Sequence, residues 1–138
     1  MSFLVDANVL SEAVRRSPAP VVIDWLTAND AALWISAITL GEIEKGIVRL
    51  SSGARRRQLD LWLHTLRNTM VGRILAFGPA EASEWARYVE KQRAKGRLLP
   101  TIDSMVAATA LVHHLSVVTR NETDFPDVRV VNPWGGAA

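Results

Sequence analysis

Residues 3–12 read Phe3-Leu4-Val5-Asp6-Ala7-Asn8-Val9-Leu10-Ser11-Glu12, and this stretch decides the fold. Its first three residues are a short apolar run that predicts a buried strand. A helix is predicted to follow at once, from Ala7 to about Arg16. A strand that passes directly into a helix is typical of folds in which helices connect parallel strands and cover the sheet. Asp6 lies at the junction between the two elements.

The rest of the chain repeats this alternation of short apolar runs and longer helical segments. Four more strands are predicted, at residues 33–36, 73–77, 115–119 and 128–131. Helices are predicted at residues 20–28, 39–50, 54–70, 80–95 and 101–114. The expected fold is one three-layer α/β/α domain with a five-stranded, mainly parallel sheet. We expect this domain to span residues 1–133 and a loose C-terminal tail to span residues 134–138.

Composition excludes several classes of protein. The chain has 138 residues, which is enough for one domain, and 49% of them are hydrophobic, which excludes a disordered protein. It contains no cysteine, so disulfides and thiolate metal sites are excluded. No apolar run approaches the roughly 20 residues of a membrane span, and the N-terminus lacks the features of a secretory signal. These observations predict a cytoplasmic protein. The net charge of +2 is compatible with nucleic-acid binding without being diagnostic of it.

Four acidic residues follow or precede predicted elements at one edge of the sheet. In an open parallel sheet, ligands bind in the crevice beyond the carboxyl ends of the strands. One acid follows the first strand, one lies in the first turn of the helix after the second strand, one begins the helix that leads into the fourth strand, and one follows that strand. They are Asp6, Glu42, Asp103 and Asp124. Each has a local alternative, because acids also cap helices and form turns, and Thr39 to Glu42 matches a capping box.

Clustered carboxylates favour a divalent cation. Two of them about 4 Å apart repel by roughly 1 kcal/mol in water and by roughly 4 kcal/mol at an effective dielectric of 20. Mg²⁺, or Mn²⁺ as a second possibility, binds such all-oxygen sites, whereas His64, His113 and His114 lack the spacing of a zinc site. A metal held in this way suits phosphodiester hydrolysis. The sequence leaves open which acid is the general base and whether one ion or two bind.

Four segments resemble, in chain order, the motifs of PIN-domain ribonucleases, and the length is that of VapC-type toxins, particularly their FitB-like branch. The segments are Leu4 to Glu12, Ser36 to Ile43, Asp103 to Ala110 and Val118 to Phe125. The resemblance implies that Asp6, Glu42, Asp103 and Asp124 are the catalytic, metal-binding acids. It also implies supporting roles for Asn8, Thr119 and Asn121. Many relatives have aspartate at the position of Asn121, so the fourth acidic role is either shared with this position or carried by Asp124, which we favour.

The resemblance further implies a metal-dependent ribonuclease that is the toxin of a toxin–antitoxin pair. Its expected partners are a cognate antitoxin, an RNA substrate such as tRNA, and a second copy of the chain in a homodimer. Trp62 and Trp85, on amphipathic helices, are candidates for either core or interface. Basic residues on two predicted helices are candidate RNA contacts, although such clusters are often merely solvated. They are Arg55, Arg56, Arg57, Lys91, Arg93, Lys95 and Arg97.

Three other functions compete with this hypothesis. A catalytically weak PIN-like domain would bind RNA or protein, but such a surface gains nothing from four acids in one crevice. A haloacid-dehalogenase-type phosphotransferase would need a second aspartate where this chain has Asn8. A DNA nuclease would use the same metal chemistry, and no residue can be identified that recognises a 2′-hydroxyl.

Overall fold

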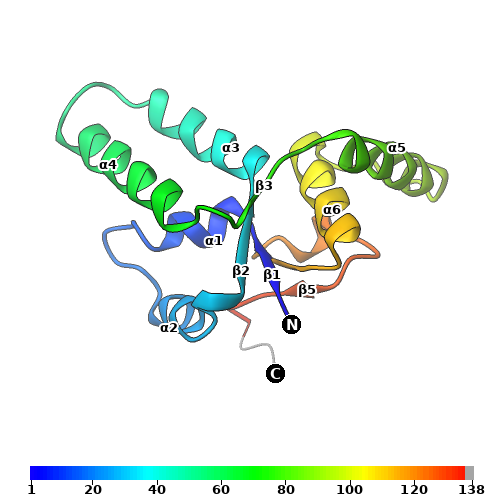
Figure 1. Cartoon of the computed structure of the whole chain (residues 1–138), viewed down its shortest axis with the longest axis horizontal. Helices are drawn as coiled ribbons and strands as arrows, with labels where there is room; N and C mark the ends of the chain where they lie inside the picture. The colour runs from blue at the N-terminus through cyan, green and yellow to red at the C-terminus, as the bar shows by residue number, and fades with distance from the viewer. Residues whose placement is uncertain (136–138) are drawn as a thin grey trace.

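A parallel sheet runs through the middle of the molecule, with helices on both of its faces (Figure 1). The computed structural model describes residues 1–135, and in this part of the chain five strands lie in the order β3-β2-β1-β4-β5. The strands are β1 (Phe3–Val5), β2 (Leu33–Ser36), β3 (Ile74–Leu75), β4 (Ser116–Val118) and β5 (Val130–Val131). Each neighbouring pair is parallel. The predicted five-stranded α/β fold is confirmed, and the described sheet is parallel throughout.

The strand order places a switch point between β1 and β4. From β1 the chain adds β2 and then β3 on one side, and it returns to add β4 and β5 on the other. Ligand crevices of parallel sheets open at such a point, beyond the carboxyl ends of the strands. Asp6 follows β1, and its N–H donates to the carbonyl of Val118, the last residue of β4, across 2.9 Å. The chain therefore brings the ends of these two strands together.

The helices form two layers. They are α1 (Ala7–Glu12), α2 (Pro20–Ala28), α3 (Ala37–Val48), α4 (Ala54–Thr69), α5 (Pro79–Ala94) and α6 (Thr101–His113), with the short 3₁₀ helices η1 (Asp30–Ala32) and η2 (Glu122–Asp124). One core contains Val5 and residues of α1 to α4, and the other contains Leu4 and residues of α5 and α6. Figure 1 shows the α3–α4 pair and the α5–α6 pair on opposite sides of the strands. Successive residues of β1 thus face different layers, as expected of a strand buried on both faces.

Two helix boundaries differ from the predicted ones because of side-chain contacts. Helix α1 ends at Glu12 and not near Arg16, since the buried Glu12 carboxylate accepts hydrogen bonds from the Ala19 N–H and from Arg15, which folds the chain back. Helix α3 begins at Ala37, two residues early, because the Ser36 hydroxyl caps it by accepting from the Ile38 N–H across 3.1 Å. The expected capping box at Thr39 is therefore wrong.

The C-terminal segment is packed further than predicted. Trp134 packs against the core of the α1–α4 layer, and the Arg120 guanidinium lies over its ring, 4.8 Å from the centroid. Trp134, the first residue of the predicted tail, is thus packed against the domain. Residues 136–138 of the predicted tail lie outside the described residues. None of the described helices combines the length and hydrophobicity that a membrane span requires.

Candidate active site

Asp6 is the most buried of the four predicted acids, with 3% of its surface exposed. It caps α1, and its Oδ1 accepts from the Ala7 N–H across 2.9 Å. Its Oδ2 accepts from the Asn8 amide across 3.2 Å and from the Thr119 hydroxyl across 2.8 Å. Burial raises the pKa of Asp6 in spite of these donors, and the negative charge of Asp124 raises it further. The capping role and the crevice position are therefore compatible in one residue.

The three predicted supporting residues meet at the Thr119 hydroxyl. This fully buried oxygen donates to Asp6 and accepts from the Asn8 amide and from the Asn121 N–H, across 3.2 and 3.0 Å. Asn8 also accepts from the Arg120 N–H across 3.2 Å. Asn8 and Thr119 join this cluster of hydrogen bonds through their side chains. Asn121 joins it through its backbone N–H, and its side chain is exposed.

The charge of Asp6 raises the pKa values of two other predicted acids, Glu42 and Asp103. Burial raises the pKa of Asp103 to about 7, and the charges of Asp6, Asp124 and Glu42 add to this shift in that order. Burial also raises the pKa of Glu42, with a further rise from Asp6 and an opposing effect of Lys45. The charges of all three other acids therefore act on Asp103. The sequence predicted Glu42 in the first turn of its helix. In the structure Glu42 lies in the second turn of α3.

The helix that carries Asp103 is anchored at its first turn. The Trp85 indole N–H of α5 donates to the Ser104 hydroxyl across 2.9 Å, and this hydroxyl donates to the Thr101 carbonyl across 2.7 Å. Ser104 is buried, so these bonds hold the residue next to Asp103 in place. Trp85 is half-buried, and its indole N–H bonds to a residue of the same domain.

The crevice fits a hard divalent cation by its donor set. Its acids supply carboxylate oxygens, and burial together with their mutual repulsion raises the pKa of Asp103 to about 7, so that a cation would displace a proton there. Among the described residues, no three His, Asp or Glu side chains lie close enough together, as placed, to hold one ion. Binding therefore requires the more exposed acids, Glu42 and Asp124 above all, to rotate toward buried Asp6.

The loop that carries Asp124 is held by α5, which the sequence did not predict. The Tyr88 hydroxyl donates to the Pro126 carbonyl across 2.7 Å, and the buried Gln92 amide donates to the Asp127 carboxylate across 2.8 Å. Asp127 has a left-handed backbone, with φ of 61°. Tyr88 and Gln92 are one helical turn apart, and this spacing of polar groups was the only signal in the sequence.

The candidate RNA contacts differ in how freely they face solvent. At the end of α5, Lys95 and Arg97 lie 3.0 and 4.0 Å from the Asp127 carboxylate, and Arg93 pairs with Glu90. Lys91 and Arg57 are exposed. Arg55 and Arg56, in the first turn of α4, donate to the carbonyls of Val14 and Leu50. Arg56 also lies 4.0 Å from Asp60, so four of the predicted contacts have acidic partners within the domain.

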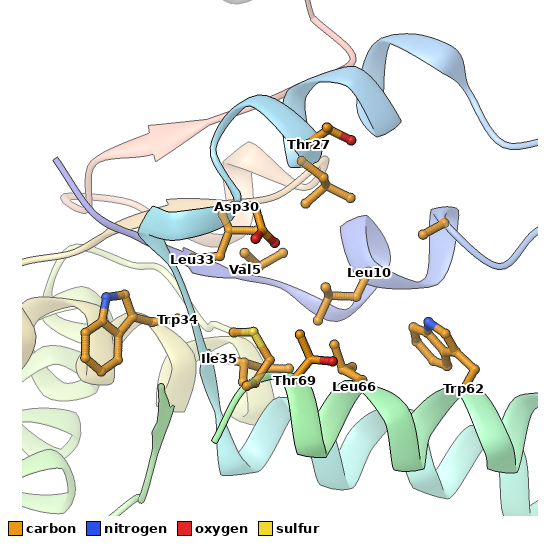
Figure 2. Close-up of a pocket in the computed structure, with 13 residues that line it drawn as sticks. Val5, Leu10, Thr27, Asp30, Leu33, Trp34, Ile35, Trp62, Leu66 and Thr69 are labelled. Atoms are coloured by element: carbon orange, nitrogen blue, oxygen red, sulfur yellow. The ribbon is translucent and has the colours of Figure 1, made fainter. Parts of the chain in front are cut away.

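A separate apolar pocket of about 410 Å³ lies on the α1–α4 face, and none of the four acids lines it. Figure 2 shows Trp62 and Leu66 projecting from α4 toward Leu10 of α1. Trp62 packs against the core and remains partly exposed, so it is both a core residue and part of a surface pocket.

Comparison with known proteins identifies the family. The family model described as PIN domain matches residues 3–131. The chain belongs to the PIN-domain family. This PIN domain is 35% identical to the plasmid stability protein StbB of Pseudomonas syringae pv. tomato, over 95% of the chain and 97% of the relative. It is 34% identical to toxin FitB of Neisseria gonorrhoeae, with 95% and 97% covered.

Two further relatives agree with the predicted type of PIN domain. The VapC ribonuclease Y4jK of Sinorhizobium fredii is 29% identical over 95% of the chain and 96% of the relative. A crystal structure of FitAcB from Neisseria gonorrhoeae superimposes with a TM-score of 0.91 at 34% identity, covering 96% of this chain and 98% of that one. The predicted resemblance to VapC-type toxins of the FitB-like branch is confirmed.

Proposed function

We propose that this PIN domain is a divalent-metal-dependent ribonuclease and the toxin of a toxin–antitoxin pair. The observation that carries the proposal is the position of buried Asp6 at the end of β1, where Asn8 and Thr119 hold its carboxylate and the charges of the other predicted acids act on it or on Asp103. Relatives named as toxin and as VapC ribonuclease support the same activity. Mg²⁺ is the proposed physiological ion, with Mn²⁺ as a substitute, since both suit a set of carboxylate ligands.

The residues divide into metal ligands and groups that orient them. Asp6, Glu42, Asp103 and Asp124 are the proposed ligands, and together they are the proposed catalytic residues. When bound, the ion supplies Lewis acidity that activates water and offsets charge on the scissile phosphate. Asn8 and Thr119 hold Asp6 in one orientation through their hydrogen bonds, and the Asn121 N–H fixes the Thr119 hydroxyl. A carboxylate not fully engaged by the ion is available to accept a proton.

The proposed partners follow from the family. One relative is named toxin FitB, and a structure with a TM-score of 0.70 at 26% identity is described as a toxin-antitoxin complex from Klebsiella pneumoniae. We therefore propose a cognate antitoxin for this chain. RNA, including structured RNA such as tRNA, is the proposed substrate, the proposed state is a homodimer, and the proposed compartment is the cytoplasm. Size-exclusion chromatography with light scattering tests the dimer, and a monomer at micromolar concentration contradicts it.

The decisive experiment separates catalysis from binding. Purified protein free of any partner is incubated with total cellular RNA in Mg²⁺ or in EDTA, beside the Asp6→Asn variant. Discrete cleavage is expected only in the wild type with metal, and the ends of the fragments identify the target. If RNA is bound and never cut under any divalent ion, while the fold is intact, the protein is instead a catalytically weak RNA-binding module.

A further inference from the structure

We infer that a groove between the end of α1 and the start of α4 binds phosphates of the RNA substrate and leads the strand to the acidic crevice. This inference rests on the proposed ribonuclease function. The groove has a volume of about 760 Å³, and it is lined by residues 13–16 on one side and by Ala54, Arg55, Gln58, Leu59 and Trp62 on the other. Three arginines line it, Arg15, Arg16 and Arg55. Such a concentration of guanidinium groups fits a polyanion.

This arginine groove shares residues with a second groove that is lined by one of the four acids. The second groove, of about 400 Å³, is lined by Glu42 and by Ala7, the neighbour of Asp6. Arg15 and Arg55 line both grooves. A strand whose phosphates bind the arginines would therefore continue to Glu42, one of the proposed metal ligands.

The turn that carries two of the arginines is fixed in place. The buried Glu12 carboxylate accepts from Arg15 across 3.2 Å and from the Ala19 N–H across 2.8 Å. Arg55 donates to the Val14 carbonyl across 2.7 Å and so ties the turn to α4. These bonds leave other N–H groups of both guanidiniums available, since arginine has five. Arg16 is exposed and forms no ion pair within residues 1–135.

The floor of the groove is apolar and aromatic. Leu59 and Trp62 line both grooves, and Figure 2 shows the Trp62 ring standing out from α4. Proteins that bind single-stranded nucleic acid combine a positive groove with aromatic side chains on which bases stack. These features favour an unpaired segment of RNA as the occupant.

Neighbouring basic residues provide matched controls. Arg57 is exposed and lies in the same first turns of α4 as Arg55, but it lines neither groove. Arg56 donates to the Leu50 carbonyl and lies 4.0 Å from Asp60. Arg57→Ala therefore removes the same charge from the same helix without touching the proposed path.

The test measures RNA binding apart from cleavage. A short fluorescein-labelled single-stranded RNA is titrated in EDTA, by anisotropy, with wild type, Arg16→Ala, Arg15→Ala/Arg16→Ala and Arg57→Ala, over a range of NaCl concentrations. Each lost phosphate contact is expected to reduce the salt slope by about 0.7 and the affinity roughly 5-fold at 0.1 M salt. The double variant should therefore bind roughly 25-fold more weakly, and Arg57→Ala should bind almost like wild type. Since Arg15 contacts buried Glu12, thermal unfolding of each variant confirms the fold, and Arg16→Ala alone gives an independent result.

Two outcomes overturn the inference. One is that the double variant and Arg16→Ala bind RNA as tightly as wild type, as they would if the groove holds a partner protein. The other is that Arg57→Ala loses as much affinity as Arg16→Ala, which would show only a general effect of charge. Metal-dependent cleavage by the wild type is measured in parallel. If the wild type cuts RNA while the groove variants bind normally, the groove assignment fails and the ribonuclease function stands.

Discussion

The Thr119 hydroxyl donates to the Asp6 carboxylate across 2.8 Å and joins two strand ends that lie 113 residues apart in the chain. It lies at the switch point between β1 and β4, where the strand order reverses. The same oxygen accepts from the Asn8 amide and the Asn121 N–H. A single buried hydroxyl therefore sets the orientation of the most buried acid in the crevice.

Thr119→Val is expected to lower both stability and activity, because it keeps the shape of the side chain and removes these hydrogen bonds. Leaving buried polar groups unpaired costs about 1–3 kcal/mol, so the free energy of unfolding should fall by about that amount. Urea unfolding and RNA cleavage in Mg²⁺ measure the two effects. Thr27→Val is the control, since it removes an exposed hydroxyl bonded to the Ile23 carbonyl. Equal behaviour of the two variants would refute the role of Thr119.

Asp103→Asn is expected to stabilise the metal-free protein and to reduce its response to Mg²⁺, because it removes one of four repelling charges. At ten times its dissociation constant, Mg²⁺ should add about 1.4 kcal/mol to the wild-type protein. This corresponds to a rise in Tm of about 3–6 °C for a domain of this size. Thermal unfolding with and without Mg²⁺ measures the gain. Asp24→Asn, at an exposed acid of α2, is the control, and an equal Mg²⁺ response in both variants would count against the metal site.

The stability of the metal-free protein is expected to fall between about pH 4 and pH 7. The pKa of Asp103 in the folded protein is raised to about 7 from its ordinary value of 3.8. Its contribution to stability is therefore complete below about pH 4 and is lost as the pH rises through about 7. The loss relative to Asp103→Asn should be about 1–2 kcal/mol, because the half-exposed side chain is partly screened. Urea unfolding in EDTA at several pH values tests this, and parallel curves for both proteins would contradict it.

The sheet and the position of the acids could be predicted because both depend on short-range patterns. An apolar run of three to five residues identifies a strand, Asp6 follows β1 directly, and Asp124 lies in the loop after β4. Parallel pairing then brings the carboxyl ends of β1 and β4 to one edge of the sheet, independently of the conformation of the loops. The acids of the crevice needed no knowledge of side-chain packing.

The features that could not be predicted depend on contacts between distant or competing groups. Thr39 and Ser36 are both good helix caps in sequence, and only the structure shows that the helix begins at Ala37 with Ser36 as its cap. Likewise Lys95 and Arg97 form a basic cluster in sequence, but their pairing with Asp127 depends on how α5 packs against a loop 30 residues later. Patterns of charge and polarity do not encode such pairings.

Asp124→Asn is expected to reduce cleavage less than Asp6→Asn or Asp103→Asn. Asp124 lies on the 3₁₀ helix η2, one turn beyond the end of β4, and its charge acts on Asp6 more weakly than do burial and the hydrogen bonds from Thr119 and Ala7. Asp124 also lies in the same loop as Asn121, which can share its role, whereas Asp6 is buried at the end of β1. Measuring kcat/KM on one RNA at fixed Mg²⁺ ranks the three variants. Equal losses in all three would mean that Asp124 is as central as Asp6.

Gln92→Ala is expected to raise the Mg²⁺ concentration required for activity several-fold while leaving kcat at saturating Mg²⁺ close to wild type. Gln92 is buried on α5, and its amide holds Asp127, three residues after Asp124, in a left-handed conformation. Without this bond the loop can move, so the ion must hold Asp124 in place as it binds, which weakens binding and not the reaction itself. Mg²⁺ titrations followed by calorimetry and by cleavage give the affinity and kcat separately. Arg93→Ala is the matched control, because this neighbouring side chain is exposed and pairs only with Glu90 among the described residues. A drop in kcat and Tm with an unchanged Mg²⁺ affinity would show instead that Gln92 merely supports the fold.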